Sequence, residues 1–232
     1  MVDEVLWNIF LMAVCYAYIV FVIVVSSKLN DFLHVSRKIS RKFLHVMIGN
    51  LPFIIPFFTS NVYPTLVAAP FIPVTFLASP YAPLKSASEK MKGLVGITEE
   101  GHSLGLVFYA ISYTVLAFFF ASEPYIMAAG ILPMAYGDAF ASIVGEKYGK
   151  KKFRLLANKS VEGSVAMFIF SFSSYALSLA FFSTLYSFSF FDKVFSAVVV
   201  ALVATVVEGV SPLGFDNLTV PIFSVLALTL LG

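Results

Sequence analysis

Long apolar runs separated by short polar segments dominate the sequence. A helix needs about 20 apolar residues to cross a hydrocarbon core roughly 30 Å thick. The runs predict eight spans, at about 5–25, 43–58, 62–79, 104–121, 124–143, 161–183, 194–210 and 218–232. The last run is short enough to be a half-span. No repeat or linker separates the runs, so we expect residues 1–232 to form a single integral membrane domain. The expected fold is all-α: a polytopic membrane helical bundle of about eight transmembrane helices.

The composition agrees with this expectation. The chain is 59% hydrophobic and 12% charged, whereas soluble domains are roughly 45–50% apolar and about 25% charged. So few charges would not cover a water-facing globule of this size. The single cysteine, Cys15, excludes a disulfide framework and a cysteine-based zinc site. A net charge of +2 gives no indication of nucleic-acid binding, and we expect none.

Basic residues gather in three predicted loops. Segments 26–42, 80–103 and 145–159 hold 14 of the 15 Lys and Arg residues, and the eight-span pattern places all three on one side. Because short cytoplasmic loops are enriched in Lys and Arg, this side is predicted to be cytoplasmic. Asp3 and Glu4 precede the first run, which is the reverse of a signal peptide, so the first span is expected to be retained. We expect a multi-pass protein of the cell membrane in a prokaryote, or of the endoplasmic reticulum in a eukaryote.

Proline is concentrated in the second and third runs. Seven of the 11 prolines lie between Pro52 and Pro83. Each interior proline frees a backbone carbonyl that a neighbouring helix or a cavity must satisfy. These spans are therefore expected to be kinked or broken. Two interpretations stay open: irregular packing, or the wall of a pocket that lipid can enter.

Four acidic residues lie at or just inside the predicted cytoplasmic ends of spans: Asp138, Glu162, Glu208 and Asp216. An ionisable group in the hydrocarbon region costs about 2.5–3.5 kcal/mol on insertion scales, so each needs a reason to be there. Carboxylates gathered on one face near lysines suit a hard divalent cation such as Mg²⁺ with bound phosphates. The alternative is that each caps a helix or pairs with a loop lysine.

Basic and polar residues lie close to these carboxylates. Lys159 and Ser160 open the sixth span, where a helix N-terminus would favour an anion. Arg41 and His45 are four residues apart and so share a helix face, and this places His45 about one turn inside the membrane boundary. His45 is either functional or a packing residue. The run from Gly145 to Lys152 resembles a phosphate loop only superficially, because it lacks the Walker A spacing.

An ordered set of motifs carries a family resemblance. The motifs are Arg41-Lys42-x-x-His45, Gly137-Asp138-Ala-x-Ala141-Ser142-x-x-Gly145-x-x-x-Gly149, Lys159-Ser-x-Glu162-Gly163-Ser164 and Glu208…Asp216-Asn217. Together they resemble the dolichol kinase/phytol kinase family, which also includes a CTP-dependent diacylglycerol kinase. The resemblance is strongest at 136–217. It implies a kinase that phosphorylates a membrane lipid alcohol, of the polyprenol, dolichol, phytol or geranylgeraniol type, using CTP and a divalent cation.

The resemblance also implies roles for particular residues. Asp138, Lys159 and Glu162 would serve nucleotide and metal, with Glu208, Asp216 and Asn217 completing the site. The expected catalytic residues are Asp138, Lys159, Glu162 and His45, with a carboxylate or His45 accepting the hydroxyl proton. The expected nucleotide-binding residues are Arg41, Lys42, Ser142, Gly145, Gly149, Lys150, Asn158, Ser160 and Asn217. The expected metal ligands are Asp138, Glu162, Glu208 and Asp216.

Two other functions compete with this interpretation. A CTP:lipid-phosphate cytidylyltransferase shares donor and membrane setting, but typically has Asp-Arg near its C-terminus, whereas Asn217 follows Asp216 here. A membrane transporter tends to bind substrate at mid-membrane between repeated halves, whereas these charges crowd one face and no repeat is visible. The tail of the lipid, the general base and the oligomeric state are left undecided by the sequence.

Overall fold

Helices make up most of the computed structural model, which describes residues 2–33, 36–83, 104–154, 156, 158–212 and 214–231. The first elements are α1 (Val2–Leu33), α2 (Arg37–Ile48), the 3-10 turns η1 (Leu51–Phe53) and η2 (Ile55–Phe57), α3 (Val62–Ala68), α4 (Phe71–Leu77) and α6 (Gly105–Phe120). Then follow α7 (Pro124–Leu132), the π-helix η3 (Pro133–Gly137), α8 (Asp138–Tyr148), β1 (Lys152–Arg154), β2 (Asn158–Ser160), α9 (Val161–Phe182), α10 (Phe190–Val210) and α11 (Asp216–Leu230). The predicted all-α class is confirmed.

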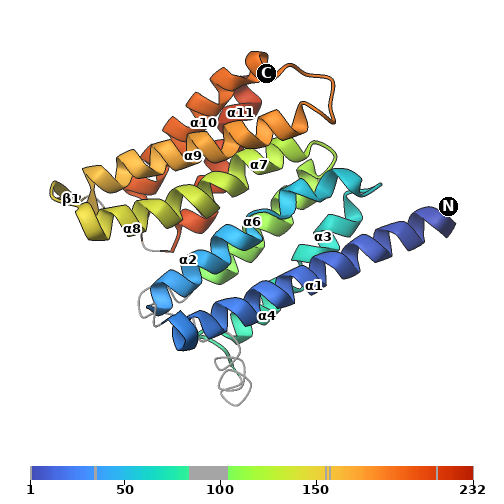
Figure 1. Ribbon diagram of the computed structural model, residues 1–232, viewed down its shortest axis with the longest axis horizontal. Coiled ribbons are helices and arrows are strands. Elements are labelled where there is room, and N and C mark those ends of the chain that lie inside the picture. The colour runs from blue at the N-terminus through green and yellow to red at the C-terminus, as the bar shows by residue number, and fades with distance from the viewer. Residues whose placement is uncertain are drawn as a thin grey trace.

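Figure 1 shows two groups of helices lying side by side. The later helices α8, α9, α10 and α11 form one group, and α1 to α4 lie on the other side. α6 contacts α3, α4 and α11, while α7 contacts α9 and α11, so these two helices join the groups. The hairpin, the end of α8 and the start of α2 lie at one end of the molecule, and the N-terminus lies at the other.

Four helical segments are long and apolar enough to cross a membrane: Val2–Leu29, Pro124–Tyr148, Val161–Phe182 and Phe190–Val210. Large apolar side chains cover the outer surface, with Leu177 at 71% and Phe191 at 82% exposure. Such a surface suits lipid and not water, so this is a membrane protein. The eight-span topology stays a prediction, because the remaining apolar helices are shorter: Val62–Leu77, Gly105–Phe120 and Asp216–Leu230.

Two predicted boundaries were wrong. The first helix runs on to Leu33 and not to about residue 25. Its extension lies against α2, where the buried Ser26 hydroxyl donates to the Ser40 carbonyl oxygen at 2.7 Å. The segment 145–159 is not simply a loop, because it contains the end of α8 and most of an antiparallel hairpin in which Phe153 pairs with Lys159.

The proline-rich region is broken, as predicted. α2 ends at Ile48. Each of the two 3-10 turns that follow has a proline at its second position, Pro52 in η1 and Pro56 in η2. Pro70 separates α3 from α4. Most of the predicted loop 80–103 lies outside the described residues. The short helices of this region pack against α6, so apolar side chains and not a regular backbone hold it in place.

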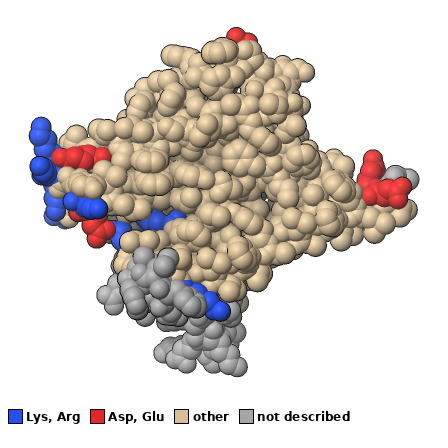
Figure 2. All heavy atoms as spheres, viewed as in Figure 1, with Lys and Arg blue, Asp and Glu red and all other residues tan. Residues whose placement is uncertain are grey.

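Charged side chains are concentrated at the end of the molecule where the hairpin lies (Figure 2). Two helices approach each other very closely there. A Cβ added to Gly163 of α9 would lie 3.0 Å from the Ala141 carbonyl oxygen and 3.3 Å from Gly145 Cα of α8. Glycine at both positions therefore lets α8 and α9 pack almost backbone to backbone. This contact brings the hairpin residues against the ends of α8, α10 and α11.

Candidate active site

A polar cavity of about 290 Å³ opens at the charged end of the molecule. Its walls come from α2, α8, the hairpin, α9, α10 and α11. The lining residues are Lys38, Arg41, Lys42, Asp138, Ala141, Ser142, Gly145, Glu146, Lys152, Asn158, Lys159, Ser160, Gly163, Ser164, Glu208 and Asp216. Segments far apart in the sequence therefore contribute to one site.

One face of α2 supplies three cations to the cavity. Ser36 caps this helix, accepting a hydrogen bond from Ile39 N at 3.3 Å. Lys38, Arg41 and Lys42 then follow at spacings of three and four residues, which place them on one helix face. Arg41 and Lys42 are each only 6% exposed. Lys38 is more exposed and forms an ion pair with Glu146 of α8 at 2.6 Å.

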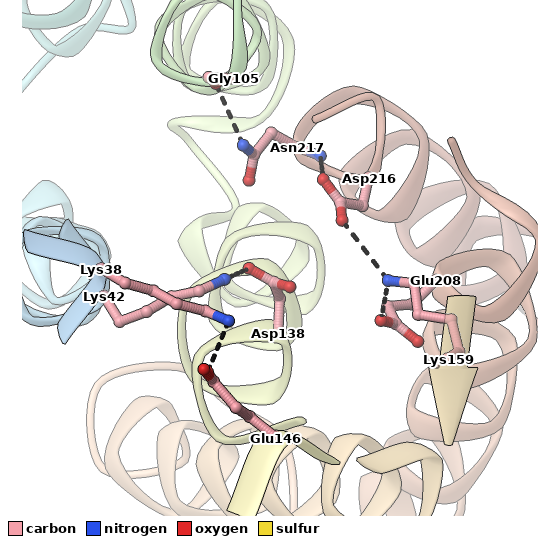
Figure 3. Close-up of polar contacts among 9 residues, drawn as sticks. All are labelled: Lys38, Lys42, Gly105, Asp138, Glu146, Lys159, Glu208, Asp216 and Asn217. Atoms are coloured by element: carbon pink, nitrogen blue, oxygen red, sulfur yellow. Dashed lines mark hydrogen bonds and ion pairs between the residues drawn. The ribbon is translucent and has the colours of Figure 1, made fainter. Parts of the chain in front are cut away.

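Asp138 lies at the junction of the π-helix and α8. It is buried and forms an ion pair with Lys42 (Figure 3). A π-helix is rare and often marks a functional site, because it re-aims the side chains that follow it. The Gly137 backbone also presses against Met167 of α9, since an added Cβ would lie 2.7 Å from the Met167 sulfur. The position of Asp138 is thus determined by tight packing beneath it.

Lys159 of β2 lies among carboxylates from two other helices. It forms an ion pair with the buried Glu208 of α10, and its Nζ lies 3.8 Å from Asp216 Oδ2 of α11. Burial by itself lowers the pKa of Lys159, but the charges of Glu208, Asp216 and Asp138 more than offset this and raise it above its ordinary value. Lys159 therefore stays charged at neutral pH.

Asn217 connects α11 to α6 and does not line the cavity. Its backbone N–H donates to Asp216 Oδ1 at 3.0 Å, and its Nδ2 donates to the Gly105 carbonyl oxygen at 3.1 Å (Figure 3). The Ser112 hydroxyl donates to the Asn217 carbonyl oxygen at 2.7 Å. These bonds hold the start of α11, and with it the Asp216 carboxylate, beside the cavity.

Three of the four predicted carboxylates face the cavity: Asp138, Glu208 and Asp216. Within the described part of the chain, no group of three or more His, Cys, Asp or Glu side chains is close enough to hold a metal by itself. Mg²⁺ usually takes one or two carboxylates together with substrate phosphates and water. The residues present therefore fit a cation that arrives with phosphates, and do not form a complete protein cage.

The structure does not bring Glu162 into the cavity. Both Glu162 carboxylate oxygens lie 3.3 Å from Lys151 N and accept a hydrogen bond from its N–H. Glu162 therefore holds the backbone at the base of the hairpin. Ser160 lines the cavity and also caps α9, accepting from Gly163 N at 3.1 Å. Gly149 and the exposed Lys150 lie near the hairpin and are not part of the lining.

The remaining predicted residues divide between two places. Ser142, Gly145 and Asn158 line the polar cavity, as do Arg41, Lys42 and Lys159. His45 lies on the wall of a second, apolar cavity. Its ring lies against Tyr109, with centroids 4.6 Å apart.

Sequence reasoning missed four polar lining residues: Lys38, Glu146, Lys152 and Ser164. A signal for Lys38 was present, because Lys38, Arg41, Lys42 and His45 recur at helical spacing. The sequence around Glu146 contains no comparable pattern, since a run of charged residues such as this one is typical of a solvated helix end. Its role depends on the contact between α2 and α8.

The fold and the site together define a helical membrane protein with a buried, charged cavity at one end. The chain is 36% identical over 128 residues to the phytol kinase of Synechocystis sp., covering 54% of this chain and 53% of that protein. It is 34% identical over 208 residues to the probable phytol kinase 1, chloroplastic, of Oryza sativa subsp. japonica, covering 85% and 65%. It is 33% identical over 208 residues to the probable phytol kinase, chloroplastic, of Triticum aestivum, covering 85% and 68%.

The chain belongs to the phytol kinase family. It spans between about half and two thirds of the length of these relatives. No family model matches the chain, and no solved structure matches it.

Proposed function

We propose that this protein is a lipid-alcohol kinase that transfers the γ-phosphoryl group of CTP to the hydroxyl of a membrane isoprenoid alcohol. The observation that carries the proposal is the gathering of Arg41, Lys42 and Lys159 with three carboxylates around one cavity of a membrane protein. Membership of the phytol kinase family supports the same reaction.

The reaction needs charge compensation more than covalent help from the protein. The lipid oxygen forms a bond to the γ-phosphorus, the bond from that phosphorus to its bridging oxygen breaks, and CDP leaves. Lys42, Lys159 and Arg41 line the cavity and would compensate the triphosphate charge during this transfer. The raised pKa of Lys159 keeps its charge in place for that role.

A divalent cation, when bound with the nucleotide, would supply the remaining neutralisation of phosphate charge. Asp138 and Asp216 would hold it, since both carboxylates face the cavity. In the free protein Lys42 and Lys159 lie beside these carboxylates and compensate the same charges. The ion pairs thus keep the site folded before substrates enter.

We propose that His45 is the general base that accepts the proton of the lipid hydroxyl. An imidazole can accept a proton at neutral pH, and His45 lies one turn along α2 from Lys42, which lines the polar cavity. His45→Gln should lower kcat about a hundredfold, at the lower end of the range for loss of a general base. The KM for CTP should change little. An unchanged kcat would contradict the assignment.

The preference for CTP over ATP rests mainly on the family resemblance. Ser142 and Asn158 line the cavity and offer hydrogen-bonding groups for a pyrimidine ring. A site built on such bonds rejects analogues that leave its own groups unpaired. UTP is the sharper comparison, because it differs from CTP mainly at position four of the ring. The measurement is relative kcat/KM for CTP, UTP and ATP with one prenyl alcohol.

The direct test uses the purified full chain in lipid nanodiscs with γ-labelled CTP, Mg²⁺ and a panel of lipid alcohols. We expect a labelled lipid monophosphate and one CDP for each product molecule. In a parallel reaction with a lipid monophosphate in place of the alcohol, a CDP-lipid with labelled pyrophosphate would instead identify a cytidylyltransferase. Transfer from ATP as fast as from CTP would refute the nucleotide preference and leave the kinase standing. Absence of transfer from every nucleotide tested to every alcohol would refute the kinase.

We also propose that the chain is multi-pass and that the charged end faces the cytoplasm, in line with the distribution of basic residues. Lys147→Cys, in a Cys15→Ser background, should react with an impermeant thiol reagent only from the cytoplasmic side. Asp192→Cys, at the start of α10, should react only from the other side. Labelling of both from the same side would overturn the topology.

A further inference from the structure

A second cavity, of about 110 Å³, lies between α1, α2, the two 3-10 turns, α3, α4 and α6. Almost all of its lining is hydrocarbon. The three hydroxyl groups on its walls are engaged with backbone: the Tyr109 hydroxyl donates to the His45 carbonyl oxygen at 2.9 Å, the Tyr113 hydroxyl to that of Ile48 at 2.9 Å, and the Thr75 hydroxyl to that of Phe71 at 2.6 Å. The cavity is thus built for an apolar ligand.

The helix α2 borders both cavities. Its residues Lys38, Arg41 and Lys42 line the polar cavity, and Leu44, His45 and Ile48 line the apolar one. An α-helix rises 1.5 Å per residue, so Lys42 and His45 are only about 4.5 Å apart along the axis. The two cavities therefore adjoin at His45.

The apolar cavity also reaches the outer surface. Val74 of α4 lines it and is 37% exposed on the face that suits lipid. An apolar cavity of about 150 Å³ holds a benzene molecule, so this one has room for roughly one isoprene unit. A longer chain would have to leave it beside α4 and continue into the bilayer.

We propose that this cavity binds the hydroxyl-bearing end of the hydrocarbon tail of the lipid alcohol, with the hydroxyl at His45 and the rest of the tail passing α4 into the bilayer. The inference rests on the proposed function for the identity of the ligand. The cavity has room for one chain beside the hydroxyl and not for two. Small residues on its walls, Ala68 of α3 and Ala110 of α6, leave the space that the tail needs.

Cys15 offers a reporter that does not depend on catalysis. It is the single cysteine of the sequence, is buried in α1 and lines this cavity. Geranylgeraniol, a single-chain alcohol, should slow modification of Cys15 by N-methylmaleimide in nanodiscs. The same amount of diacylglycerol, or CDP alone, should not. Equal rates with and without geranylgeraniol would count against the tail site.

Filling the cavity gives the second test. Ala68→Leu and Ala110→Leu should each lower kcat/KM for geranylgeraniol by at least about tenfold, the scale of methylene-sized changes in apolar pockets. The KM for CTP should be unchanged. Ala180→Leu, on the exposed face of α9, is the matched control and should behave as wild type.

The outcomes separate the two proposals. If the wild type phosphorylates alcohols while both folded leucine variants keep wild-type kcat/KM and Cys15 is unprotected, the tail site is wrong and the kinase stands. If geranylgeraniol protects Cys15 but no nucleotide phosphorylates it, the tail site stands and the kinase is wrong.

Discussion

The two cavities of this protein lie in regions built on different principles. The polar cavity lies where α8 and α9 meet at Gly145 and Gly163, and the buried Lys42, Asp138, Glu208 and Asp216 each have a partner of opposite sign nearby. The apolar cavity is lined by α1, α2 and α6 together with short helices and 3-10 turns interrupted by proline. Beside the polar cavity two helices pack nearly backbone to backbone, whereas the other cavity is bounded mainly by apolar side chains.

The difference follows from what each region has to hold. Buried charges are tolerated only with well-placed partners, so the helices that carry them must be held rigidly. An apolar ligand makes no directional demand, and a gap among hydrophobic side chains is enough to receive it. Helix α2 serves both regions because its first turns carry cations and its last turns carry apolar residues.

The largest effect is expected for Asp138→Asn, which removes a buried negative charge from the polar cavity. Loss of one electrostatic stabiliser typically lowers kcat by about 100- to 1000-fold. Asp192→Asn, at the opposite end of the molecule, is the matched control and should leave kcat unchanged. Turnover of both variants is measured with CTP and geranylgeraniol. A correctly inserted Asp138→Asn protein with wild-type kcat would remove Asp138 from the site.

The Lys159 ion pairs test whether charge pairing holds the polar region together. Lys159→Met leaves Glu208 buried without its partner and should destabilise the protein by about 2–3 kcal/mol, somewhat less than for a fully buried pair. The double variant Lys159→Met/Glu208→Gln should recover part of this loss. Lys150→Met is the control, because Lys150 is exposed in the same segment. Thermal unfolding in detergent gives the ranking, and a double variant less stable than either single variant would argue against pairing.

Introducing a leucine into each region compares how tightly the surroundings of the two cavities are packed. Gly163→Leu should destabilise by about 1–3 kcal/mol or more, because the Ala141 carbonyl oxygen leaves no room for it. Ala68→Leu should leave the melting temperature close to that of wild type, since its added carbons enter the apolar cavity. Equal loss of stability in the two variants would mean that the regions are packed alike.

The smallest effect is expected for Glu162→Gln. The resemblance places Glu162 among the metal ligands, but its carboxylate holds the backbone of Lys151 outside the cavity. Its loss should weaken the hairpin and reduce kcat/KM by less than roughly tenfold, because a bond to an exposed carboxylate contributes modestly. Kinetics with increasing Mg²⁺ distinguish the roles. A large rise in the Mg²⁺ requirement would return Glu162 to the metal site.

Much of the fold was predictable because bilayer-length apolar runs and proline breaks act locally. Each predicted span overlaps helical structure, and the breaks at Pro52, Pro56 and Pro70 occur where expected. The hairpin was not predicted, since its two strands have only three residues each, are mostly polar, and are brought together by the ends of α8 and α9. The extension of α1 to Leu33 was missed because its last turns are polar and show no apolar pattern. Contact with α2 stabilises them as helix.

The sequence by itself determined the membrane class, the position of the charges at one end, and most residues of the polar site. These follow from the composition, the run lengths and the ordered motifs. Only the tertiary structure decided which charges pair, that Glu162 lies outside the cavity while Glu146 lines it, and that His45 borders an apolar cavity. The reason is that ion pairs and cavities form between segments that are far apart in the sequence, such as Lys38 and Glu146, which are 108 residues apart. The sequence of one segment does not show which other segment it will contact.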